Sequence, residues 1–185
     1  EIRFGAADKP IDTMVMGYAG HGASVGANHR FHTGNHISTP AAVDVSNNSS
    51  GDLTGDAEGF QYYTPRMSGF QVGVAYTPAA VQDTVARQST NAAISHIRTI
   101  AANYVTSFDG AKIAIAGGYN DGTSNTNNVD NPERWAVAAS VTAGAVQVRA
   151  SYHEDAERSN NITGVTSVAG QETVELGARY TQGAN

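Results

Sequence analysis

Three histidines at close spacing are the side chains of this sequence best suited to holding a metal ion. They are His29, His32 and His36, in the stretch HRFHTGNH. Imidazole is a good ligand for zinc or copper, but no carboxylate stands close to the three histidines and no local pattern fixes their arrangement. We therefore interpret the stretch as a polar loop and predict neither a metal site nor a cofactor.

Signatures of catalysis are missing from the sequence. The glycine-rich stretch GHGASVG at residues 20–26 has its third glycine misplaced for a dinucleotide fingerprint, and no strand and helix are expected around it. The chain has neither a nucleophile elbow nor a His-Glu-x-x-His motif. We predict that the protein is not an enzyme.

Charged side chains instead recur at alternate positions within apolar segments, and this is the main chemical signal. In residues 145–153, Val146, Val148, Ala150 and Tyr152 share one face, and Gln147, Arg149, Ser151 and His153 share the other. Lys112, Arg134 and Arg179 likewise oppose apolar residues of their own segments. A period of two residues indicates β-strands with one apolar and one polar face.

The elements that position these charges are expected to be strands that run up and down. We predict strands at residues 60–65, 69–77, 97–108, 112–119, 133–143, 145–153 and 172–181, and the tail of a further strand at residues 1–4. Tight turns rich in Gly and Asp alternate with long polar loops at residues 78–96, 120–132 and 154–171. This alternation predicts an all-β, antiparallel meander with short turns at one end and long loops at the other.

Composition narrows the class of protein. The net charge of −6 supplies no dense basic patch for phosphates, so nucleic acid is not an expected partner. The chain has no cysteine, which excludes disulfides and thiolate metal sites. No apolar run approaches the roughly 18 residues of a transmembrane helix.

Alternation alone leaves two interpretations open. The apolar face could be the inside of a soluble β-sandwich, such as a lectin-like binding module, or it could meet lipid. Large aromatics at the strand ends favour lipid, because aromatic girdles lie at membrane interfaces. These aromatics are Tyr76, Tyr119, Trp135, Tyr152 and Tyr180.

Two stretches resemble a known family. Residues 62–78, YYTPRMSGFQVGVAYTP, resemble the hairpin that follows the constriction loop in the general, trimeric porins of alphaproteobacteria, and residues 1–14, EIRFGAADKPIDTM, resemble the segment that precedes that loop. The resemblance implies the central fragment of a transmembrane β-barrel of about 16 strands. The whole chain, residues 1–185, would be one barrel fragment: residues 6–57 the inward-folded constriction loop, and residues 58–185 seven strands with short periplasmic turns and long extracellular loops.

The resemblance also implies a function and a set of pore-lining residues. The protein is expected in the outer membrane of a Gram-negative bacterium, in contact with the bilayer and lipopolysaccharide, as a homotrimer that passes small hydrophilic solutes and ions by passive diffusion. Opposed arginines and carboxylates would set charge selection at the constriction. The candidates are Arg3, Asp8, Asp12, Lys112, Arg134, Arg149 and Arg179, with Glu175 on the wall and Asp44, Asp52 and Asp56 in the loop. A structural envelope barrel without an open channel is the remaining alternative.

Overall fold

A computed structural model of the 185-residue chain describes residues 1–20, 53, 54, 57–80, 94–125, 130–158 and 168–181. Its strands form a single antiparallel sheet of eight strands in the order β1-β2-β3-β4-β5-β6-β7-β8. The strands are β1 Ile2–Ala6, β2 Glu58–Tyr63, β3 Phe70–Ala79, β4 Ile94–Phe108, β5 Ala111–Ser124, β6 Glu133–Ala143, β7 Val146–Arg158 and β8 Val168–Tyr180. The predicted all-β, up-and-down fold class is confirmed, and it agrees with part of a β-barrel.

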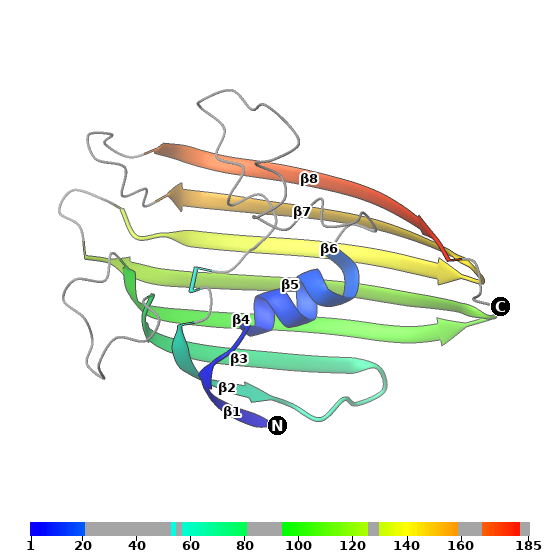
Figure 1. Ribbon diagram of the computed structural model, residues 1–185, viewed down its shortest axis with the longest axis horizontal. Coiled ribbons are helices and arrows are strands. Elements are labelled where there is room, and N and C mark those ends of the chain that lie inside the picture. The colour runs from blue at the N-terminus through cyan, green and yellow to red at the C-terminus, as the bar shows by residue number, and fades with distance from the viewer. Residues whose placement is uncertain (21–52, 55–56, 81–93, 126–129, 159–167, 182–185) are drawn as a thin grey trace.

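In the described ranges, one helix accompanies the sheet. It is η1, a π-helix over Ile11–Gly20, and it lies across β4, β5, β6 and β7 on one face (Figure 1). We call this face the inner face and the opposite one the outer face. No helix in the described ranges has the length and apolar character needed to cross a membrane.

Tight turns join alternate strands at one end of the sheet, which we call the turn side; the other end is the loop side. The β4–β5 turn uses Asp109 and Gly110, whose φ angles are 48° and 76°. Positive φ at both central positions is what a type I′ hairpin turn requires, and Asp-Gly supplies it at low cost. Ser68 and Gly69 repeat the pattern between β2 and β3, with φ of 47° and 90°. The expected turns are therefore present.

Several strands run further on the loop side than the sequence pattern predicted. β5 continues to Ser124 rather than to residue 119, and β7 to Arg158 rather than to residue 153. A register shift between Ser95 and Arg98 interrupts the pairing of β4 with β5 near this end. Backbone pairing continues there although the apolar alternation has ended.

Candidate functional site: the inner face of the sheet and its helix

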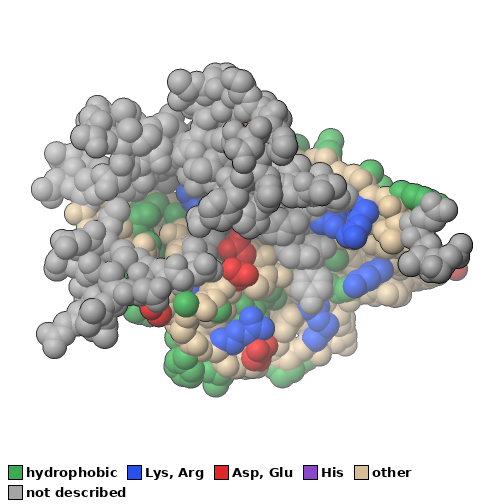
Figure 2. Space-filling view, in the orientation of Figure 1, with side chains coloured by type: hydrophobic (Ala, Val, Ile, Leu, Met, Phe, Trp, Pro, Cys, Tyr) green, Lys and Arg blue, Asp and Glu red, His purple; other side chains and the backbone are tan. Residues whose placement is uncertain are grey.

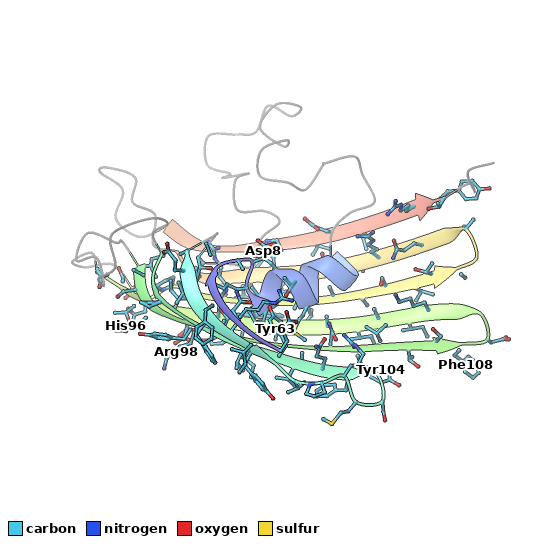
Figure 3. All side chains as sticks on the ribbon, turned by 60° about the horizontal axis from the view of Figure 1, so that its bottom comes forward. Asp8, Tyr63, His96, Arg98, Tyr104 and Phe108 are labelled. Atoms are coloured by element: carbon cyan, nitrogen blue, oxygen red, sulfur yellow. The ribbon has the colours of Figure 1, made fainter. Side chains whose placement is uncertain are left out.

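The outer face carries large apolar side chains in the open. Figure 3 shows Tyr104, Arg98 and His96 on this face, opposite the helix side where Asp8 and Tyr63 lie. Exposed fractions reach 81% for Leu176, 69% for Val174 and 56% for Ile115. All the described strands belong to one sheet, so no second sheet of the described chain covers these residues.

Aromatic side chains border the apolar band of the outer face. Trp135 and Tyr152 lie on its loop side with ring centroids 4.9 Å apart. Trp135 Nε1 donates to Glu154 Oε2 at 3.1 Å, and the Tyr152 hydroxyl donates to the same oxygen at 3.3 Å. Phe108 and Tyr180 lie at the turn side, where they are 77% and 69% exposed. From Glu172 to Tyr180 a strand tilted by about 40° rises roughly 20 Å, comparable to the lipid-facing band of an outer-membrane barrel.

The inner face has mostly small and polar residues in place of these large ones. At mid-height it holds a patch of glycines and alanines that we call the seat: Gly73, Ala101, Ala116, Gly118, Ala136 and Ala138. Three apolar residues of η1 are packed on the seat, namely Ile11, Met14 and Val15, each at most 2% exposed. A Cβ built on Gly118 would lie 2.9 Å from Ile11 Cγ1, closer than such contacts are found. The small side chains thus let the helix approach the wall.

Hydrogen bonds fix the start of the helix to the same wall. Asn103 Nδ2 donates to the Met14 carbonyl at 3.3 Å. The Thr13 hydroxyl lies 3.1 Å from the hydroxyl of Tyr63, which donates to Gln61 Oε1 at 2.8 Å. Gln61 is fully buried. Polar groups therefore surround the apolar contact and hold the helix in one register.

Lys9 joins the two ends of the segment between β1 and β2. Its side chain is fully buried, and Nζ donates to the carbonyls of Ala7 and Ala57, each at 2.6 Å. A buried ammonium is costly unless hydrogen bonds satisfy it. Lys9 is therefore a structural clasp, and sequence reasoning missed it because no local pattern marks a lysine whose partner lies 48 residues away.

The predicted pore-lining residues fall into separate groups. Arg3 makes a bidentate contact with Glu1, through Nε at 2.8 Å and Nη2 at 3.0 Å, and its guanidinium lies 4.8 Å from the centre of the Tyr63 ring. Asp8 is exposed, whereas Asp12 is half-buried. Arg3 and the two aspartates are thus at the β1–η1 end of the inner face.

The remaining candidates lie on either side of the seat. Arg134 is on the loop side, 8% exposed and opposite Asn120. Lys112, Arg149 and Arg179 are on the turn side of the seat. Asp44, Asp52, Asp56 and the three histidines lie outside the described residues. In the described part of the chain no group of three potential metal ligands comes together.

Arranged in this way, the inner face exposes Lys112 and Arg179 on the turn side of the helix and Asp8 near the start of the helix. A family model described as Gram-negative porin matches residues 1–185. No curated protein sequence matches the chain.

Proposed function

The chain belongs to the Gram-negative porin family, and from that premise we propose that it forms a water-filled channel for the passive diffusion of small hydrophilic solutes and ions. A Gram-negative porin resides in the outer membrane of the bacterium, embedded in the bilayer. We propose further that the channel is open and that residues 6–57, which include η1, form its constriction.

One observation carries the proposal: most large apolar side chains of the sheet are exposed on the outer face, whereas the side chains beneath the helix are mostly small or polar. Leu176 and Val148 are 81% and 54% exposed, whereas Ala136 and Gln61 of the inner face are fully buried. In a soluble sandwich the large residues would fill a close-packed interior. The reverse arrangement suits a wall with lipid outside and water inside.

The edges of the sheet indicate how such a wall would close. β1 pairs only with β2, and β8 only with β7, within the described sheet. Open sheet edges are not tolerated in lipid, because unpaired backbone groups find no hydrogen-bond partner there. We propose that further strands pair with both edges to complete a barrel of about 16 strands. The resemblance to alphaproteobacterial porins supports a homotrimer, with lipopolysaccharide and bilayer lipids against the free outer face.

Planar-bilayer recordings on the purified full-length protein test the channel directly. We expect stepwise current increases in KCl, and swelling of proteoliposomes in small sugars but not in large dextrans. Membrane extraction that requires detergent, with no current and no swelling, would instead support a structural barrel. Release into buffer without detergent would favour a soluble binding module.

A further inference from the structure

Three basic side chains form a group on the turn side of the inner face. Lys112 of β5 is in register with Thr142, which is in register with Gln147, and Gln147 is in register with Arg179 of β8. Arg149 lies one row nearer the seat, opposite Ser140 and Gly177. Although Arg149 lies in the adjacent row, we call Lys112, Arg149 and Arg179 together the basic row. Since neighbouring strands are about 4.8 Å apart, Lys112 on β5 and Arg179 on β8 are separated by roughly 14 Å along the wall.

These cations lack carboxylate partners in the described part of the chain. Arg149 uses Nε and Nη2 to donate to Gln147 Oε1, at 3.2 and 2.9 Å, and no described residue forms an ion pair with Lys112 or Arg179. Glu175 lies on the wall one row further from the turns than Arg149, and it accepts from the Ser151 hydroxyl at 3.3 Å. Figure 2 shows Lys and Arg side chains gathered on this face over the right-hand, turn-side part of the sheet.

Apart from Glu175, the acidic residues in the described parts of the same strands lie at the other end of the sheet. Asp121, Glu133, Glu154 and Glu172 are at the loop side, and Glu154 receives the hydrogen bonds of the outer-face aromatics Trp135 and Tyr152. The net charge of −6 therefore does not describe the turn-side wall, which is positive. A wall of low dielectric behind fixed charges focuses their field into the water beside them.

We propose that the basic row attracts small anions, chloride and short carboxylates among them, and raises their permeability relative to cations. The inference rests on the proposed channel. Lys112 and Arg179 are exposed, so contact with a passing anion is brief, as solvent-exposed ion pairs are weak. Guanidinium groups can also donate two parallel hydrogen bonds to a carboxylate, which favours short dicarboxylates at Arg149 and Arg179.

The test measures the ion selectivity of the full-length protein in a planar bilayer. The reversal potential is recorded in a tenfold gradient of KCl and then in a gradient of potassium succinate, and each value gives an anion-to-cation permeability ratio. We expect the triple variant K112Q/R149Q/R179Q to lower the chloride-to-potassium permeability ratio by about three- to fivefold, because a unit charge at 7 Å in water changes the local anion concentration by about threefold before screening. The single variants R179Q and K112Q should each account for part of the change. The differences should shrink in 1 M salt.

Arg98→Gln is the matched control. It removes the same charge from an exposed arginine of the outer face, where Arg98 pairs with Asp121, and the permeability ratio should stay at the wild-type value. If the triple variant does not insert, the exposed single variants R179Q and K112Q decide the question. Channels that conduct with an unchanged ratio in every basic-row variant would overturn the inference and leave the channel proposal standing. A wild-type protein that inserts but passes no current would overturn the channel proposal itself.

Discussion

The outer and inner faces of this sheet come from the same strands, yet they differ in what they demand of their side chains. On the outer face Val148, Leu176 and Val174 are exposed and need only be apolar. On the inner face Ala101, Ala116 and Ala136 are at most 5% exposed and must also be small. Lipid adapts to the surface it meets, whereas a helix of fixed shape does not. The size of the side chains is therefore constrained on the inner face, where the helix packs, and much less on the outer face.

The largest effect is expected from a charge placed on the outer face. Ile115→Arg should lower the free energy of unfolding by about 2–4 kcal/mol, since an arginine at mid-membrane depth loses its hydration. Urea unfolding of the protein in lipid vesicles measures the change. Thr142→Arg on the inner face is the control and should cost less than about 1 kcal/mol. Equal costs at the two sites would contradict the assignment of the faces.

Loss of the clasp is expected to come next. Lys9→Met keeps the length of the side chain but removes the donor that the carbonyls of Ala7 and Ala57 share. The Ala7 carbonyl keeps the hydrogen bond that Gln61 Nε2 donates at 3.1 Å, whereas the buried Ala57 carbonyl loses its donor, at a cost of about 1–3 kcal/mol. We expect lower stability and noisier single-channel currents, because both ends of the segment between β1 and β2, the proposed constriction, are released. If Lys9→Met channels gave currents as quiet as those of the wild type, the hydrogen bonds of Lys9 would not be what holds the segment between β1 and β2 in place.

Two adjacent glycines sharpen the comparison of the faces further. A Cβ at Gly118 meets Ile11 at 2.9 Å, whereas a Cβ at Gly117 meets Val137 Cγ1 at 3.6 Å, an ordinary contact. Gly118→Ala should cost about 1–3 kcal/mol through overpacking beneath the helix and should change the conductance. Gly117→Ala, one residue away on the other face, should leave both quantities close to wild type. The reverse order would place the helix elsewhere.

The smallest effect is expected at the loop-side rim of the outer face. Asp121→Asn removes the charge that pairs with Arg98, whose side chain is 72% exposed. Exposed ion pairs contribute about 0–1 kcal/mol. We expect a change in stability below about 1 kcal/mol and an unaltered permeability ratio. A larger loss would mean that the rim pair is shielded from water in the membrane.

Much of the fold could be predicted because it is encoded locally. The positive φ values of the Asp109–Gly110 turn follow from the residue types themselves, and β6 runs over the predicted residues 133–143. The loop-side ends of β5 and β7 were predicted too short. At these ends the side chains on both faces are polar, and backbone hydrogen bonds maintain the pairing. Such bonds impose no alternation of apolar and polar residues that the sequence could reveal.

The candidate site was predictable only in part. Alternation placed Lys112, Arg149 and Arg179 on the face away from the large apolar residues, and the structure has them there. It did not indicate that Arg3 is paired with Glu1, or that residues 11–20 form a helix in a segment expected to be a loop. The glycines and alanines that alternate along the inner face were a usable signal. Such small residues on one face of neighbouring strands indicate that another segment of the chain packs closely against that face.

By itself, then, the sequence determined the central part of most strands, where the tight turns fall and which side chains share a face. These properties depend on neighbours within a few positions. The tertiary structure decided which face the helix covers, that the seat consists of Gly118 and the alanines around it, and that Lys9 joins residues 7 and 57. Those contacts link parts of the chain far apart in sequence, and only the folded sheet brings them within reach.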